Sequence, residues 1–132
     1  LASLAASCGI EKNVVLNGYT KYEQLPLILN DSLLYVLSSL HEAENMSIVE
    51  AAFCGVPVVS TAVGLAGELT ENTVLPGDYK ALASKINFVL NNYEIEKQKS
   101  LSRIPELHKR FSLRITVNNF VELYKSMTKL GS

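Results

Sequence analysis

The feature that most constrains the fold is an alternation of short apolar runs with amphipathic segments. The runs 13–18, 33–39 and 56–61 are short, apolar and bounded by turn residues, which is typical of buried strands. Between them, 21–32 and 45–54 carry apolar residues at helical spacing. This order of strand, helix, strand, helix and strand predicts an α/β fold, an open parallel sheet with helices on both faces. The run 33–39 is apolar on both faces and is therefore expected to be a central strand.

The rest of the chain is predicted to be mostly helical, and residues 1–132 suit a single domain. The first residues read as the last turns of a helix with Gly9 as its C-cap, so we expect the chain to be a piece of a larger protein. The remaining predicted elements are a short helix (64–70), an extended piece (Val74–Leu75), a helix capped by Asp78 (79–91) and two further helices (94–110 and 113–129).

Composition excludes several classes of function. Apolar residues make up 48% and charged residues 19% of the 132 residues, with a net charge of −1, so no strong field is expected to attract nucleic acid or an anionic membrane. Cys8 and Cys54 belong to no cysteine–histidine cluster, which argues against a zinc site or disulfide framework and favours buried free thiols. Neither a signal peptide nor an apolar run near the ~20 residues of a membrane span is visible, so we expect a cytoplasmic location.

The stretch HEAENMSIVEAAFCGVPVVS places three carboxylates, Glu42, Glu44 and Glu50, at the carboxyl end of a predicted strand. One interpretation is structural. Ser47 and Glu50 match a capping box, and the two earlier acids would then favour the helix macrodipole. Spacing alone favours this interpretation, because short motifs often match by chance.

A functional interpretation uses the same geometry. The N-terminus of a helix offers unpaired N–H groups and positive potential to a phosphate. An acid one turn inside that helix, such as Glu50, could accept hydrogen bonds from a ribose diol. An acid in the preceding loop, such as Glu42, could meet sugar hydroxyls or a positive charge developing at an anomeric carbon.

A longer match favours the functional interpretation. The stretch SLHEAENMSIVEAAFCGVPVVSTAVGLAGEL resembles the signature of nucleotide-sugar glycosyltransferases of the two-domain GT-B architecture, the retaining enzymes called group 1 or family 4. The resemblance is strongest over 13–92, and over 94–129 only the helical pattern agrees. It implies a Rossmann-like fold, as part of the C-terminal, donor-binding domain. The matching motif positions are Glu42, Glu50, Ala51, Gly55, Pro57, Val58 and Val59.

The resemblance also implies roles for individual residues. Glu42 would be the catalytic contact to the transferred sugar, and Glu50 would bind the ribose hydroxyls of the donor. The Gly18–Tyr19 turn would lie against the base, although Tyr19 could instead be a partly buried aromatic at a strand end. The backbone amides implied to receive sugar hydroxyls and phosphate are those of Asn45, Met46, Ser47 and Ile48.

For the full-length enzyme, the resemblance implies hexosyl transfer from a nucleoside diphosphate sugar to a glycan or lipid-linked acceptor, in polysaccharide or glycoconjugate biosynthesis. No cofactor and no metal are expected. The necessary partner is the N-terminal, acceptor-binding domain of the same enzyme, so the isolated chain is predicted to be inactive. No nucleic acid partner is expected. Association with the inner face of a membrane is left open only for the full-length protein.

Two departures from the family pattern keep a second hypothesis open. The family's Gly-aromatic-Gly after the first acid is replaced by Ala43-Glu44-Asn45-Met46, which adds side chains where a sugar should approach, so Glu44 must point away. The Arg and Lys that neutralise the donor diphosphate in the family would lie upstream of this chain. The alternative is therefore a degenerate, non-catalytic module that serves assembly or partner binding. The sequence names neither the sugar, the nucleotide, the acceptor nor the oligomeric state.

Overall fold

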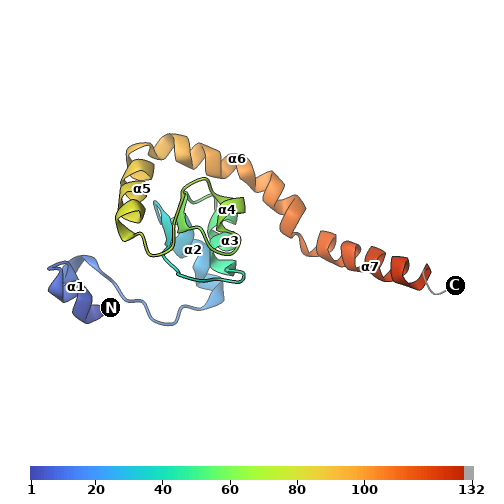
Figure 1. Ribbon diagram of the computed structural model, residues 1–132, viewed down its shortest axis with the longest axis horizontal. Coiled ribbons are helices and arrows are strands. Elements are labelled where there is room, and N and C mark those ends of the chain that lie inside the picture. The colour runs from blue at the N-terminus through green and yellow to red at the C-terminus, as the bar shows by residue number, and fades with distance from the viewer. Residues whose placement is uncertain (130–132) are drawn as a thin grey trace.

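A three-stranded parallel sheet forms the centre of the molecule in the computed structural model, which describes residues 1–129 (Figure 1). Its strands are β1 (Tyr35–Leu37), β2 (Val58–Thr61) and β3 (Thr73–Val74), in the order β1-β2-β3. All neighbours are parallel, with Val36 opposite Val59 in the first pair. The predicted α/β class is confirmed.

Helices cover both faces of this sheet. Figure 1 shows the sheet between α5 (Tyr79–Asn91) on one side and α3 (Met46–Phe53) with α4 (Ala66–Leu69) on the other. Helix α3 connects β1 to β2, and α4 connects β2 to β3, as expected for crossovers between parallel strands. Helix α3 contacts β1 and β2, whereas α5 contacts β2 and β3.

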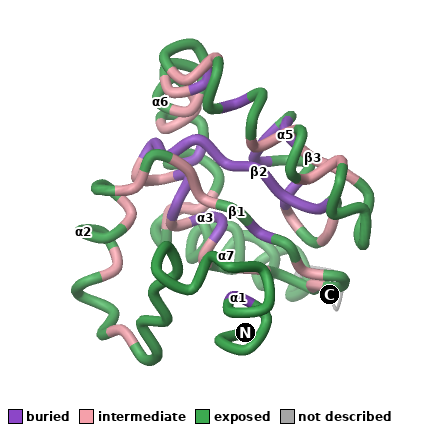
Figure 2. The backbone as a smooth tube through the Cα atoms, turned by 90° about the vertical axis from the view of Figure 1, so that its left-hand side faces the viewer, coloured by how far each residue is buried: buried purple, intermediate pink, exposed green. Residues whose placement is uncertain are grey.

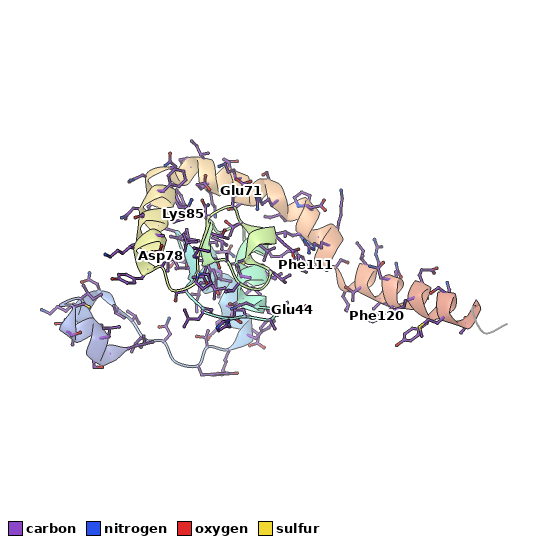
Figure 3. All side chains as sticks on the ribbon, in the orientation of Figure 1. Glu44, Glu71, Asp78, Lys85, Phe111 and Phe120 are labelled. Atoms are coloured by element: carbon purple, nitrogen blue, oxygen red, sulfur yellow. The ribbon has the colours of Figure 1, made fainter. Side chains whose placement is uncertain are left out.

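The C-terminal helices leave the sheet. Helix α6 (Tyr93–Phe111) crosses the domain against α3, and α7 (Leu113–Lys129) continues away from it, carrying the exposed Phe120 (Figure 3). In the described part of the chain, no helix combines the length and the apolar character needed to cross a membrane. The remaining elements are α1 (Ala2–Ser7), the 3₁₀ turns η1 (Glu11–Asn13) and η2 (Tyr22–Gln24), and α2 (Leu25–Asn30).

Strand β2 is the centre of the core. All four of its residues are buried, which Figure 2 shows as a continuous buried stretch of the chain. Ile48 from α3 and Val89 from α5 are both 0% exposed, so both helical layers contribute fully buried side chains. Because burial of apolar surface is the main favourable term in folding, this layered packing fixes where the ends of the strands lie.

Local signals mark the helix ends as the sequence indicates. The carboxylate of Asp78 accepts a hydrogen bond from the Ala81 amide at 2.9 Å and so caps α5. Gly55 follows α3 with φ +65°, and a Cβ there would lie 2.6 Å from Cδ2 of Leu101. The position therefore favours glycine for its backbone conformation, and a larger residue would also have to displace the Leu101 side chain of α6.

Three expectations from the sequence are wrong. The run 13–18 is extended at Val14 but pairs with no described strand, and Val15 is 80% exposed. A strand needs a neighbour to complete its hydrogen bonds, and periodicity cannot show whether one is present. Periodicity also misplaces the run 33–39. Among the described strands, β1 pairs only with β2, so it is an edge strand, with Val36 exposed, rather than the expected central strand. Cys8 is exposed rather than buried, and Cys54 is half-buried; both thiols are free.

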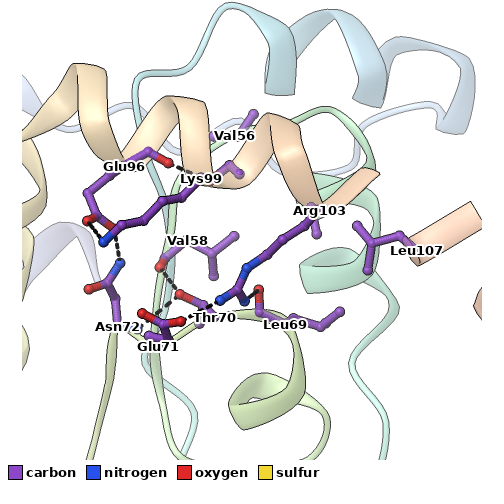
Figure 4. Close-up of a pocket in the computed structure, with 12 residues that line it drawn as sticks. Val56, Val58, Leu69, Thr70, Glu71, Asn72, Glu96, Lys99, Arg103 and Leu107 are labelled. Carbon is purple, nitrogen blue, oxygen red and sulfur yellow. Dashed lines mark hydrogen bonds and ion pairs between the residues drawn. The ribbon is translucent and has the colours of Figure 1, made fainter. Parts of the chain in front are cut away.

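A polar cluster ties α6 to the loop that enters β3 (Figure 4). Glu96 is buried, and its carboxylate accepts hydrogen bonds from Asn72 Nδ2 at 2.8 Å and Lys99 Nζ at 2.7 Å. Burial alone would raise the pKa of Glu96, but the hydrogen bonds from Lys99 and Asn72, together with the charges of Lys99 and Lys85, outweigh it and hold the pKa below its usual range. Arg103 adds a hydrogen bond to the carbonyl of Leu69 at 2.9 Å.

The core predicts a contrast between two isoleucines that both lie in helices. Ile48→Ala should lower the free energy of unfolding by about 2–5 kcal/mol, because it opens a cavity beside β2. Ile95→Ala on α6, where the side chain is 59% exposed, should change it by less than about 0.5 kcal/mol. Urea unfolding followed by circular dichroism measures both. Equal effects would contradict the assignment of the core.

Glu96 predicts a pH dependence of stability. Its pKa in the folded protein is depressed, so its contribution is present above the pKa of an unfolded glutamate and is lost as pH falls through the folded pKa. Glu96→Gln should therefore cost about 1–2 kcal/mol at pH 7, and this difference from wild type should shrink below the usual range of a carboxyl group. The exposed Glu106→Gln on the same helix is the control. A difference between Glu96→Gln and wild type that is constant with pH would contradict the ionised, hydrogen-bonded carboxylate.

Candidate functional site

Two loops meet at the carboxyl edge of the sheet. The loop 38–45 follows β1, and the loop 62–65 follows β2. Thr61, the last residue of β2, donates from Oγ1 to the carbonyl of Ser39 at 2.6 Å. Gly64 has φ +51°, and a Cβ there would lie 3.2 Å from the carbonyl oxygen of Ala43. The absence of a side chain at Gly64 therefore lets the two loops approach closely.

Glu42 is the best-anchored acid of the first loop. Its Oε1 accepts hydrogen bonds from Ser39 Oγ at 2.7 Å and from Asn45 Nδ2 at 3.0 Å. The bond from Ser39, and then that from Asn45, lowers the pKa of Glu42 against a smaller opposing effect of desolvation. The side chain is thus a carboxylate at neutral pH, suited to accept hydrogen bonds or to stabilise a positive charge rather than to donate a proton.

Asn45 is the N-cap of α3. Its side-chain oxygen accepts from the amide of Ser47 at 3.0 Å and from the Ser47 hydroxyl at 2.5 Å. The Ser47 hydroxyl also bonds to the phenol of Tyr35 on β1. The capping box expected from Ser47 and Glu50 is therefore wrong, because Ser47 already lies inside the helix and Asn45 precedes it in extended conformation.

The backbone amides that the resemblance assigns to donor binding lie at the start of α3. N–H groups there have no carbonyl of a preceding helical turn to bond to. The Ser47 amide is engaged by the cap. Met46 is 58% exposed, whereas Ile48 is 0% exposed with its backbone included, so a ligand at this helix end can reach Met46 but not Ile48.

An open hollow of about 440 Å³ lies beside Glu42. The two loops supply all of its walls, so it is a direct consequence of their meeting at the edge of the sheet. The residues lining it are His41, Glu42, Ala43, Val63 and Gly64.

Glu50 lies one turn further along α3 and lines a different hollow, of about 230 Å³, between α2 and α3. This second hollow is mostly apolar, and its rim holds Cys54, whose pKa is raised by burial and then by the charge of Glu50. Glu42 and Glu50 therefore do not share one pocket. The other residues lining the second hollow are Tyr22, Leu25, Pro26, Leu29 and Phe53.

Two predicted contacts lie outside both hollows. Gly18 and Tyr19 belong to the exposed segment before η2, and Tyr19 is 92% exposed, so the partly buried alternative for Tyr19 is wrong. Glu44 is also exposed, and it makes no hydrogen bond or ion pair with any residue that the structure describes (Figure 3). Glu44 is thus not part of the network that holds Glu42.

Three residues of the site are missed by the sequence analysis. Tyr35 reads as a strand residue and Ser39 as a loop residue, and only the fold brings both hydroxyls to the Glu42–Asn45 loop. Gly64 carries a weak signal, because a glycine just after a strand often marks a close backbone approach. Within residues 1–129 no group of three or more His, Cys, Asp or Glu is arranged to hold a metal ion.

The fold and the site define a class. Loops at the carboxyl ends of parallel strands, followed by the N-terminus of a helix, are where open α/β sheets bind nucleotide-type ligands. Comparison with known families agrees, because residues 1–105 match the model of the glycosyl transferases group 1. The chain belongs to this family, and its fold is that of a partial C-terminal domain of the GT-B architecture.

Three relatives are longer than this chain, and two of them are named as glycosyltransferases. The chain is 26% identical over 91% of its length to the 2-deoxystreptamine N-acetyl-D-glucosaminyltransferase of Niallia circulans, and 27% identical over 90% to that of Streptomyces fradiae. It covers 32% and 29% of these two proteins, so it spans about a third of their length. Over 44% of the chain and 13% of the relative, it is 41% identical to the mannosylfructose-phosphate synthase of Agrobacterium fabrum.

Two glycines that lie close together in the sequence predict opposite effects. Gly64→Ala should destabilise the protein by about 1–2 kcal/mol, because alanine is strained at φ +51° and its Cβ would lie 3.3 Å from Cβ of Glu42. Gly67→Ala in α4 meets no atom within 4 Å and should be neutral or stabilising by up to about 1 kcal/mol. Thermal unfolding of both variants tests the close approach of the loops, and a stabilising Gly64→Ala would contradict it.

Proposed function

We propose that this chain is the donor-binding part of a retaining glycosyltransferase that takes its sugar from a nucleoside diphosphate sugar. The observation that carries the proposal is the anchored Glu42 carboxylate, held by Ser39 and Asn45 directly before the N-terminus of α3. A fixed negative charge beside a helix N-terminus suits a substrate that has a negative phosphate on one side and a developing positive charge on the other.

The phosphate groups and the sugar would bind on opposite sides of the Glu42 carboxylate. The amides of Asn45 and Met46 would receive the distal phosphate and sugar hydroxyls directly. The Ser47 amide is engaged by Asn45 and Ile48 is buried, so these two would contribute through the positive potential of the helix end. The open hollow of about 440 Å³ beside Glu42 would hold the transferred sugar. Glu42 would then contact the sugar and stabilise positive charge at its anomeric carbon.

The nucleoside would bind further along α3. Glu50 would accept hydrogen bonds from the ribose diol, and the apolar second hollow beside it supports this role because it could receive the flat face of a base. The Gly18–Tyr19 turn would lie against the base only if the exposed segment before η2 folds onto the nucleotide. This closure is part of the proposal.

The complete reaction needs more protein than this chain supplies. The curated relatives are about three times as long, which supports a further, acceptor-binding domain in the full-length enzyme. We propose that the acceptor is a glycan or a lipid-linked sugar, that transfer needs no metal and that the enzyme works in the cytoplasm. The chain alone should transfer no sugar.

The names of the relatives indicate which donors should be tested first. Two of them name an N-acetyl-D-glucosaminyl group and one names mannosylfructose phosphate. Nucleotide-activated N-acetylglucosamine and mannose are therefore the first two donors of choice.

The alternative, a non-catalytic module for assembly, rests on the replaced Gly-aromatic-Gly motif. One part of this objection is answered by the structure, because the side chain of Asn45 turns back to cap α3. Calorimetric titration of the full-length protein with nucleotide sugars separates the two functions, since no heat with any donor would favour the module.

Substitution of the three acids in the full-length enzyme tests the proposal. Glu50→Gln should weaken donor binding about tenfold, because charge-assisted hydrogen bonds to the ribose are lost. Glu42→Gln should lower kcat about 100-fold with a smaller change in donor KM, because its charge matters most in the transition state. Steady-state kinetics with saturating acceptor measures both.

Glu44→Gln is the matched control, since it removes the same charge from the same loop at an exposed position. It should change kcat and KM by less than about threefold. If Glu44→Gln impairs transfer as much as Glu42→Gln, the assignment of Glu42 is wrong.

A further inference from the structure

Asn45 stands where the family pattern has the second glycine of Gly-aromatic-Gly, and a side chain there was expected to obstruct the sugar. The structure shows a different arrangement. The side chain of Asn45 lies between Glu42 on one side and Ser47 on the other, and it hydrogen-bonds to both. Asn45 is not among the residues that line the open hollow, so its side chain does not fill the opening beside Glu42.

The orientation of the Asn45 amide is determined by its partners. One terminal atom of the Asn45 side chain accepts two hydrogen bonds, from the backbone N–H of Ser47 at 3.0 Å and from the Ser47 hydroxyl at 2.5 Å. A backbone N–H can only donate, so this atom is the oxygen. The NH₂ group is then the atom that faces Glu42, at 3.0 Å from Oε1. A flipped amide would place a donor against the Ser47 amide and an acceptor against a carboxylate.

The protons of the neighbouring hydroxyl groups follow from the same reasoning. Ser47 has one hydroxyl proton and gives it to Asn45 Oδ1, so its bond with Tyr35 requires the phenol to donate. Ser39 donates its proton to Oε1 of Glu42. The hydrogen bonds therefore run in one direction, from Tyr35 through Ser47 and Asn45 to the carboxylate.

This chain of hydrogen bonds starts at the sheet. Tyr35 belongs to β1. Thr61 of β2 donates a hydrogen bond to the carbonyl of Ser39 and so fixes the backbone of Ser39. Glu42 lies in a loop, yet both of its donors are held by residues of neighbouring strands. Such support restricts the carboxylate before any ligand arrives.

Both hydrogen bonds to Glu42 end on Oε1. Among the described residues none donates a hydrogen bond to Oε2, and Glu42 lines the open hollow. The carboxylate thus has one oxygen engaged by the protein and one available to a ligand.

From this geometry we propose that Asn45 is a positioning residue for Glu42: its amide, oriented by Ser47 and Tyr35, holds Oε1 so that Oε2 is presented to the sugar of the donor. The role of the sugar rests on the proposed function, whereas the effect of Asn45 on Glu42 does not. A side chain that departs from the family pattern thereby orients Glu42 instead of obstructing the sugar.

The first test follows the Glu42 carboxylate itself, by ¹³C NMR titration of this chain. Asn45→Ser retains an oxygen that can cap α3 but loses the amide NH₂ group that donates to Glu42, so the pKa of Glu42 should rise by about half a pH unit. Asn45→Asp also caps the helix and adds a like charge, so the rise should be about one pH unit or more. Asn87→Asp, exposed on α5, is the charge-matched control and should leave it unchanged.

Variants of Ser47 test the chain of hydrogen bonds behind Asn45. Ser47→Ala should raise the pKa of Glu42 by part of the Asn45→Ser effect, because one of the two donors that orient the amide is lost. Ser47→Thr keeps the hydroxyl and should restore the wild-type value. If Asn45 only caps the helix, Asn45→Ala will lower stability while neither Asn45→Ala nor Asn45→Ser moves the pKa of Glu42, and the proposal is overturned.

The second test uses the full-length enzyme and a nucleotide-sugar donor. Asn45→Ser should lower kcat about tenfold and change donor KM less than twofold, because it disorders the charge needed in the transition state. An unchanged kcat would overturn the proposal. If the wild-type enzyme transfers no sugar at all, the proposed function fails, and the NMR titration still decides whether Asn45 positions Glu42.

Discussion

The burial of β2 between two helical layers is the constraint on which the rest of the structure depends. Each of its four residues is buried, and it is the strand that pairs with both neighbours. Parallel pairing on each side brings the carboxyl ends of the strands to one edge. The loops after β1 and β2 can therefore meet only there, and the close approach at Gly64 completes the contact.

The position of this edge explains the chemistry of the acids. Glu42 is in a loop and would be mobile alone, but hydroxyl groups from β1, the loop and the first turn of α3 fix it through Ser39 and Asn45. Glu50 is fixed differently, by the helix that carries it, and lines a separate hollow. Two carboxylates with different neighbours suit two different parts of one elongated substrate, which is the division of roles that the proposed nucleotide-sugar donor would need.

Much of the fold could be predicted from the sequence, because local signals and burial agree there. The buried run before Thr61, the face of α3 that includes Ile48 and the cap at Asp78 were all readable from periodicity and turn residues. The run 13–18 was not, since an apolar pattern does not show whether a partner strand lies beside it. The site was predictable only as far as its motif extends. Asn45 reads as an obstruction until the fold places Ser47 and Tyr35 behind it.

The central claim is that a nucleotide-sugar donor binds around the N-terminus of α3, between Glu42 and Glu50. The most direct test is titration of the ¹⁵N-labelled chain with nucleoside diphosphate sugars, followed by amide chemical shifts, because this method detects weak binding. We predict saturable shifts centred on the amides of Met46, Ser47 and Ile48, which in Glu50→Gln should need about tenfold more donor to saturate. Saturable shifts confined to α6 and α7, or no shift with any donor, would contradict the account.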